Sequence, residues 1–206
     1  MLPRSQMLTG QIADIYPENP DLSNIPKEYW QFADIFCKQK AKFLPVHCPY
    51  NLTIQIEEGA ILPFGPIYSL SSIELQTLQE FIEKNTKMGI IQPSNSPYGV
   101  PALFVKKKNS TLCLYVNYQG LNHLTRKDRY PIPLITDLLD APKKACYYTK
   151  IDLRSTYHLV YIARGNEWKT AFRTCYRSFE WLVMPFGLSN TPSVFQRFMN
   201  DIFSDL

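Results

Sequence analysis

Residues 100–118, VPALFVKKKNSTLCLYVNY, consist of two extended apolar runs separated by a polar centre. The runs at 100–105 and 112–118 are rich in β-branched and aromatic residues, and Asn-Ser at 109–110 supplies turn residues between them. The stretch therefore predicts a β-hairpin. Alternate side chains of its second strand are expected to point to opposite faces.

Upstream of this hairpin, residues 71–89 carry the clearest helical pattern. Ser71 followed by Glu74 matches a capping box, and Gly89 is a typical C-terminal stop. Apolar residues between these signals fall on one stripe, so the helix is expected to serve as scaffold. Further upstream, the alternation at 52–56 predicts a half-buried strand.

Downstream of the hairpin, short helices and strands follow in irregular order. Helices are predicted at 134–139 and from Thr191, with Thr191 as the cap and Pro192 at the first position. Strand-like runs and a turn at 184–187 fill the rest of this region. The runs are 146–153, 158–163, 168–174 and 179–184. Hairpins without a regular βαβ alternation indicate the α+β fold class.

Length and composition exclude several classes of protein. The chain has 206 residues, enough for one large domain or two small ones, and 45% apolar residues argue against disorder. No apolar run approaches a membrane span and no secretory signal opens the chain, so no membrane partner is expected. The five cysteines are widely spaced, which favours free thiols in a reducing compartment. Residues 1–48 read as a lead-in or linker, with a short helix at 28–36.

The net charge is unevenly distributed. Residues 1–100 hold 7 Lys+Arg and 10 Asp+Glu, whereas residues 101–206 hold 15 and 8. The tightest basic cluster is at 106–108, at the predicted hairpin tip. A basic half-chain favours a polyanionic partner, nucleic acid first, although a solvated basic face explains the charge equally well.

Asp152 is the residue best placed for chemistry, because it ends the strand-like run at 146–153. A carboxylate at a strand end is well placed to hold a divalent metal, and the alternative is a turn aspartate. Glycine-rich phosphate loops and common hydrolase motifs are absent from the sequence. The three histidines share no ligand spacing, and His158 is expected to be structural.

Four long motifs occur in a fixed order: SPYGVP at 96–101, TKIDLRSTYH at 149–158, FEWLVMPFGL at 179–188 and PSVFQRFMN at 192–200. From roughly residue 45 onward, this series resembles the reverse transcriptase of gypsy-type LTR retrotransposon pol polyproteins. The resemblance implies a right-hand polymerase, with fingers and an incomplete palm. The implied divisions are 1–48 lead-in, 49–126 fingers, 127–159 palm, 160–190 fingers and 191–206 palm.

The resemblance also implies roles for individual residues. Asp152 corresponds to the first catalytic aspartate, and the Leu153 carbonyl would add a ligand for Mg²⁺, or alternatively Mn²⁺. Incoming dNTP would be bound by Lys107, Tyr157, Phe186 and Gly187. Template–primer would be contacted by Lys106, Lys108 and Gln196.

The implied partners are an RNA or DNA template–primer, dNTPs and the rest of the pol polyprotein. The implied location is intracellular, cytoplasmic or nuclear, in a virus-like particle. The Tyr-x-Asp-Asp motif of the family would fall beyond Leu206. We therefore expect no polymerisation by these 206 residues alone, and marginal stability in isolation.

Several positions depart from the family pattern. Cys113 and Gln119 stand where the family has arginine, Asn117 and Asn166 where it has aspartate, and Arg177 where it has glycine; Cys48 and Cys175 also replace arginines. Each of the changes Arg→Cys, Arg→Gln, Asp→Asn and Gly→Arg can arise from one transition mutation. Two alternatives therefore stay open, a decayed transposon relic and a module that binds nucleic acid without chemistry.

Overall fold

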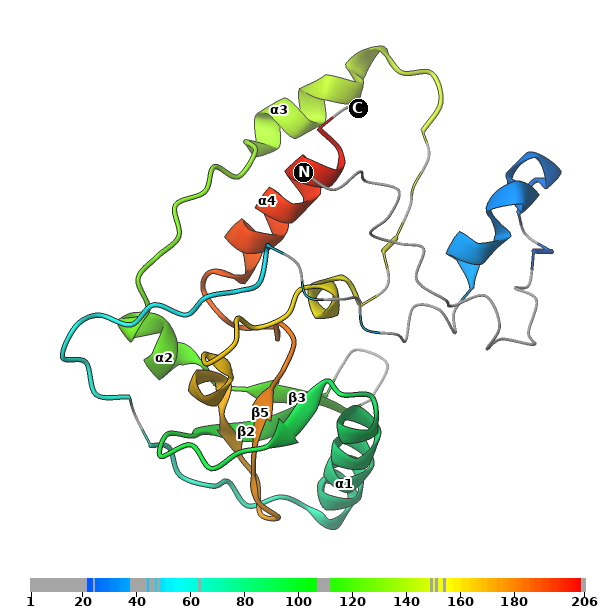
Figure 1. The fold of residues 1–206 in the computed structure, drawn as a ribbon. Helices are drawn as coiled ribbons and strands as arrows, with labels where there is room; N and C mark the ends of the chain where they lie inside the picture. Colours follow the sequence, from blue (N-terminus) through cyan, green and yellow to red (C-terminus); the bar gives the residue numbers. More distant parts are fainter. Residues whose placement is uncertain are drawn as a thin grey trace. The chain divides into compact units, whose positions relative to one another are not determined.

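The structure of the protein is a computed structural model, and its fold is drawn in Figure 1. It describes residues 22–23, 25–37, 44, 47, 49–62, 64–106, 112–148, 150, 152–153 and 155–204. The chain divides into two compact units, 1–43 and 44–206. In the first unit, η2 (Lys27–Phe36) is a 3-10 helix, which confirms a short helix in this segment.

The second unit mixes short helices with one sheet, which confirms the α+β class. Its elements are α1 (Ser72–Lys87), β1 (Ile91–Pro93), β2 (Val100–Lys106), β3 (Leu112–Val116), α2 (Gln119–Leu124), α3 (Ile135–Asp140), η4 (Ala141–Lys144), η5 (Thr156–Leu159), η6 (Glu167–Thr170), β4 (Phe172–Arg173), β5 (Ser178–Trp181) and α4 (Thr191–Ile202). Among the residues described, no helix is long and apolar enough to cross a membrane.

The sheet is five-stranded, in the order β1-β5-β4-β2-β3. β2 and β3 pair antiparallel from Ala102↔Val116 to Lys106↔Leu112, which confirms the predicted hairpin. Its tip at 107–111, including the expected Asn-Ser turn, lies outside the described residues. β4 joins β2 in parallel and β5 antiparallel, so chain segments about 70 residues apart meet in one sheet.

Helix α1 begins with the predicted capping box. The Ser71 hydroxyl accepts from the backbone N–H of Glu74 at 3.4 Å, and the Glu74 carboxylate accepts from the backbone N–H of Ser71 at 2.8 Å. The hydrogen bonds from Ser71 lower the pKa of Glu74. The helix packs against β1 and β3 (Figure 1), with Leu78 buried beneath it. Local capping and tertiary packing therefore agree here.

The hydrophobic core lies where the sheet meets the segments that follow α3. Phe172 on β4 is fully buried, and its ring lies 6.0 Å from that of Phe179 and 5.9 Å from that of Trp181. Tyr118, 1% exposed, donates its hydroxyl to the carbonyl of Thr170 at 2.8 Å. The core therefore joins β2–β3 to β4–β5.

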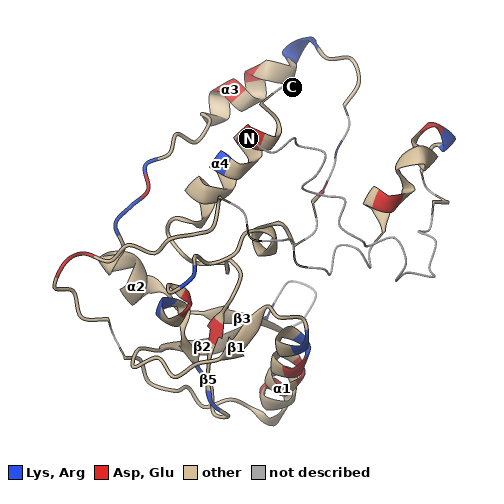
Figure 2. Cartoon of the chain, viewed as in Figure 1, with Lys and Arg blue, Asp and Glu red and all other residues tan. Residues whose placement is uncertain are grey.

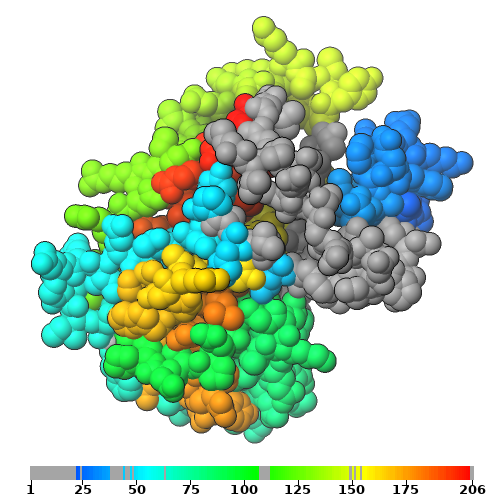
Figure 3. All heavy atoms as spheres, in the orientation of Figure 1, coloured from blue at the N-terminus to red at the C-terminus, as the bar shows by residue number. Residues whose placement is uncertain are grey.

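Two predicted strands are wrong. Residues 52–56 make only isolated bridges, Leu52 with Ile162 and Ile56 with Thr125, because these partners lie on different segments. In Figure 3 the cyan surface of the stretch around residues 50–60 adjoins the yellow surface of the stretch around residues 160–165. The described residues of 146–153 form no strand either, and Tyr147 is 94% exposed. Without a partner strand, the β pattern of that run gives no ladder.

Other boundaries differ in detail. The strand predicted at 158–163 begins as the 3-10 helix η5, and the strand predicted at 168–174 begins as η6 and reduces to β4. β5 and the turn at 186–187 confirm the next two predictions. Helix α4 has Asn190 at its N-cap position instead of Thr191, whose hydroxyl donates to the Pro185 carbonyl at 3.3 Å.

Candidate functional site

Two aromatic residues predicted to bind nucleotide lie together. The ring of Tyr157, on η5, lies 4.7 Å from the ring of Phe186 and 5.2 Å from that of Phe195 on α4. Tyr157 is half-buried, while Phe186 is 69% exposed. The cluster therefore has a packed base and an open aromatic surface, on which a sugar or base could stack.

Gly187 shapes the turn beside this cluster. Its φ of +96° lies in the left-handed region, which a residue with a side chain adopts only at a cost. A Cβ there would make only an ordinary contact with the Tyr118 ring, at 3.5 Å, so the backbone conformation is what favours glycine at this position.

Asp152 and Leu153 lie in irregular chain shortly before η5. Both are exposed, and the Leu153 carbonyl accepts a hydrogen bond from the Thr156 hydroxyl at 3.3 Å. The prediction that Asp152 ends a strand is wrong for the described residues around it, because no strand pairs with that run.

The part of the chain that the structure describes contains no group of three or more His, Cys, Asp or Glu residues that could hold a metal ion. Asp152 with a single neighbouring carbonyl is an incomplete ligand set for a pair of divalent ions, which needs several carboxylates. The described residues therefore do not form a complete metal centre.

Of the predicted basic contacts, only Lys106 lies among the described residues. Lys106 is exposed at the end of β2, and its charge makes a smaller contribution to lowering the Glu74 pKa. Lys107 and Lys108 lie outside the described residues. Gln196, on α4, is half-buried and donates its Nε2 to Asn200 Oδ1 at 2.7 Å. On α4, Gln196 directly follows Phe195, which belongs to the aromatic cluster.

A polar groove was missed by the sequence reasoning. Segments 49–55 and 126–128 line it together with α4. Arg126 and Lys127 are exposed there, while Arg197 donates to the Asp128 carboxylate at 2.9 Å. Blue residues mark this connection between α2 and α3 in Figure 2. The run Arg-Lys-Asp-Arg at 126–129 is the sequence signal for this basic segment, but the lysines at 106–108 form the tighter basic cluster.

The departures from the family pattern at positions 113, 117, 119, 166 and 177 fit the fold, and Cys48 lies outside the described residues. Cys113 and Gln119 are exposed, and Asn117 Oδ1 accepts from the Gln119 N–H at 3.1 Å. Asn166 Oδ1 accepts from Lys169 Nζ at 2.7 Å, and burial lowers the pKa of Lys169. Arg177 is exposed, and among the described non-glycine residues only Ser155 has a positive φ, so position 177 does not require glycine.

His158 predicts a pH dependence of stability. It is half-buried, with its ring 6.0 Å from that of Trp181, and burial lowers its pKa. Because the unfolded chain takes up the proton near pH ~6.5, stability is complete above that pH and is lost as pH falls toward the lower folded pKa. The free energy of unfolding is measured with urea at pH 7.5 and at pH 5.5. Between these two pH values it should fall less for His158→Gln than for the wild type. His123→Gln, at an exposed position, should show the same fall as the wild type. Equal losses in the wild type and His158→Gln would contradict this assignment.

Comparison with known proteins places these features in a family. The family model for reverse transcriptase (RNA-dependent DNA polymerase) matches residues 105–206. The Tf2-3 transposon polyprotein of Schizosaccharomyces pombe is 37% identical over 204 residues, which is 98% of this chain and 15% of that protein. The Tf2-7 polyprotein of the same organism is also 37% identical, over 205 residues. The chain thus spans about 15% of the length of these relatives.

Solved structures agree on the fold. A prototype foamy virus protease–reverse transcriptase matches with a TM-score of 0.69 and 20% identity, over 88% of this chain and 25% of that one. A foamy viral protease–reverse transcriptase in complex with an RNA/DNA hybrid matches with a TM-score of 0.66 and 19% identity, over 89% of this chain and 26% of that one. The α+β architecture is therefore that of a right-hand polymerase. The chain belongs to the reverse transcriptase family, in the branch found in the polyproteins of LTR retrotransposons.

Proposed function

We propose that this chain supplies the fingers and the first part of the palm of an RNA-directed DNA polymerase encoded by a gypsy-type element. The divisions at 49–126, 127–159, 160–190 and 191–206 are the proposed boundaries of these parts. The observation that carries the proposal is the contact of Tyr157 with Phe186, at 4.7 Å between ring centroids. It joins the segment just after Asp152 to a turn about 30 residues later.

In this proposal the incoming dNTP lies against the open face of that aromatic pair. Tyr157 would sit beneath the sugar and disfavour a ribose 2′-hydroxyl, and Gly187 would leave room for the nucleotide beside Phe186. Lys107 would contact the triphosphate as a point charge. Asp152 and the Leu153 carbonyl would ligate Mg²⁺ or Mn²⁺, together with ligands outside the described residues; the ion would neutralise triphosphate charge.

Template–primer would lie along the basic residues of the second half of the chain. We assign phosphate contacts to Lys106, Lys108, Arg126 and Lys127, and a contact near the duplex to Gln196. Partners would include the rest of the polyprotein, within an intracellular virus-like particle. Primer extension on an RNA template by the polyprotein that contains this chain tests the proposed activity, with the Asp152 variant described below as its control.

A second candidate is a module that holds nucleic acid without chemistry. Exposed Cys113, at a position where the family pattern has a cation, favours it, because a thiol cannot form the bidentate contacts of an arginine. The variant Cys113→Arg in the polyprotein distinguishes the polymerase from the binding module. A polymerase should incorporate dNTPs with a lower KM after the change, whereas a binding module should gain only affinity for nucleic acid.

Binding by the 206-residue chain should depend steeply on salt. Each phosphate contact releases counterions, so affinity for a template–primer duplex should fall as salt rises from about 50 to 200 mM. Replacing Arg126 and Lys127 with Gln should make the log–log slope shallower by about two. The matched control is Lys84 and Lys87→Gln on α1, which should leave the slope unchanged. A slope near zero for the wild type would refute the electrostatic argument.

A further inference from the structure

We propose that Asn122 is a positioning residue for the nucleotide pocket. Its carboxamide holds the turn that carries Phe186, and thereby sets how tightly the incoming deoxynucleotide binds. The inference rests on the proposed function, because it concerns the same pocket. It assigns Asn122 an effect exerted through the backbone of the turn instead of through the substrate.

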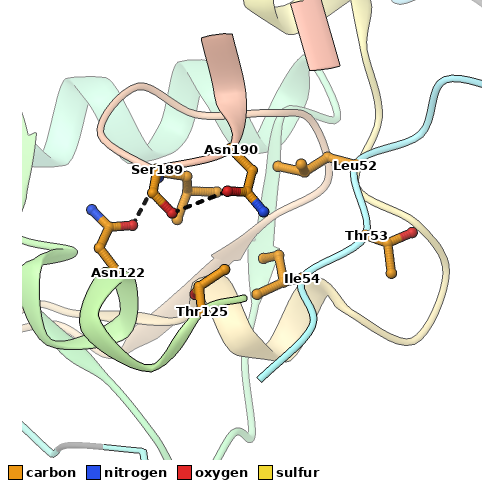
Figure 4. Close-up of a pocket in the computed structure, with 8 residues that line it drawn as sticks. Leu52, Thr53, Ile54, Asn122, Thr125, Ser189 and Asn190 are labelled. Atoms are coloured by element: carbon orange, nitrogen blue, oxygen red, sulfur yellow. Dashed lines mark hydrogen bonds between the residues drawn. The ribbon is translucent and has the colours of Figure 1, made fainter. Parts of the chain in front are cut away.

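The Asn122 side chain, on α2, bridges two backbone groups of the turn. Its Nδ2 donates to the carbonyl of Gly187 at 2.7 Å, and its Oδ1 accepts from the N–H of Ser189 at 2.8 Å. Figure 4 shows the side chain directed at Ser189, with the second of these bonds drawn. One planar amide thus uses a donor and an acceptor at once, which fixes the turn in both distance and orientation.

Backbone hydrogen bonds fix the two ends of this turn. The backbone N–H of Met184 donates to the Val160 carbonyl at 2.8 Å, and the backbone N–H of Thr191 donates to the Leu188 carbonyl at 3.3 Å, so these anchors lie on either side of Phe186 and Gly187. Gly187, between these anchors, has the wide backbone freedom of glycine and adopts a positive φ. One hydrogen bond of Asn122 holds Gly187, the residue directly after Phe186, and the other holds Ser189.

The Phe186 ring cannot be held by core packing, since it is 69% exposed. Its contact with the Tyr157 ring therefore depends on where the backbone places it. A loosened turn would let the Phe186 ring move away from Tyr157, and one wall of the pocket would lose its fixed position. Ordering that wall at the moment of binding would then weaken nucleotide affinity.

A second asparagine, Asn190, has a different structural role. It is 8% exposed, its Nδ2 donates to the Arg126 carbonyl at 2.9 Å, and its Oδ1 accepts from the Asp128 N–H at 3.2 Å. These bonds fasten the start of α4 to the 126–128 segment. Asn190 is therefore scaffold, while Asn122 reaches the turn itself.

The test compares Asn122→Ala and Asn122→Asp with Asn95→Ala, a matched control at an exposed position. Hydrogen exchange of residues 185–190 is measured in the full 206-residue chain. KM for the complementary dNTP and kcat are measured in the polyprotein during primer extension. For Asn122→Ala we expect faster exchange at Ser189 and a KM raised about tenfold, with kcat within about threefold of wild type.

Asn122→Asp keeps the acceptor for Ser189 but loses the donor to Gly187, so its KM should lie between those of wild type and Asn122→Ala. A purely structural role would lower kcat and template–primer affinity together, which would overturn the proposal. Unchanged exchange at Ser189 in Asn122→Ala would also overturn it. If the wild-type polyprotein extends no primer, the proposed function fails, and the exchange result alone decides whether Asn122 holds the turn.

Discussion

Replacing Asp152 with Asn is expected to lower dNTP incorporation by the polyprotein about 1,000-fold. Asn keeps the size and shape of the side chain but removes the negative charge that would attract a divalent ion. Losing several kcal/mol of transition-state charge stabilisation corresponds to this factor, since each 1.4 kcal/mol is tenfold. Primer extension on an RNA template, measured under single-turnover conditions, provides the rate.

The matched control is Asp137→Asn on α3, an exposed carboxylate in the same part of the chain. It should retain the wild-type rate. Template–primer affinity of Asp152→Asn should stay at or above the wild-type value, because Asp152 is exposed and its negative charge disfavours phosphate nearby. Incorporation by Asp152→Asn within tenfold of wild type would remove Asp152 from the catalytic machinery.

Local signals in the sequence identified the elements that are stabilised locally. The capping box of Ser71 and Glu74 located the start of α1, and the two strand-like runs within 100–118 located β2 and β3. In each case neighbouring residues supply the capping or pairing partners. Sequence patterns are reliable where the interactions they encode are short-range.

The patterns failed where structure depends on distant partners. Residues 146–153 have strand-like composition, yet Tyr147 and Tyr148 are exposed and no described strand pairs with them. Conversely, Asn122 carried no sequence signal, because its importance comes from Gly187 and Ser189 more than 60 residues away. Neither case could be decided from propensity or periodicity.

The departures from the family pattern affect charge more than folding. Asn166 still accepts hydrogen bonds from Lys169 and from the Ile54 N–H, and Arg177 occupies an ordinary backbone conformation. Cys113 and Gln119 lie at exposed positions, where a lost cation removes a contact to a ligand but not a contact within the fold. The fold therefore tolerates these substitutions, and under the relic hypothesis we expect their cost in ligand binding.

Replacing Phe172 with Ala is expected to destabilise the chain by about 3–5 kcal/mol. The ring is fully buried on β4, with the rings of Phe179 and Trp181 at 6.0 and 5.9 Å. Its removal leaves a cavity where the two halves of the sheet meet, and those rigid neighbours cannot collapse into it. Since whole domains are stable by only about 5–15 kcal/mol, urea unfolding should show a much lower midpoint with an unchanged m-value.

Phe186→Ala is the matched control for this loss, because the same atoms are removed from a ring that is 69% exposed. It should cost less than about 1 kcal/mol of stability, since little apolar area returns to water. Its effect should appear instead in nucleotide binding, as a raised KM for dNTP in the polyprotein. Equal destabilisation by the two variants would mean that Phe186 belongs to the core, and the aromatic surface proposed to bind nucleotide would then be structural.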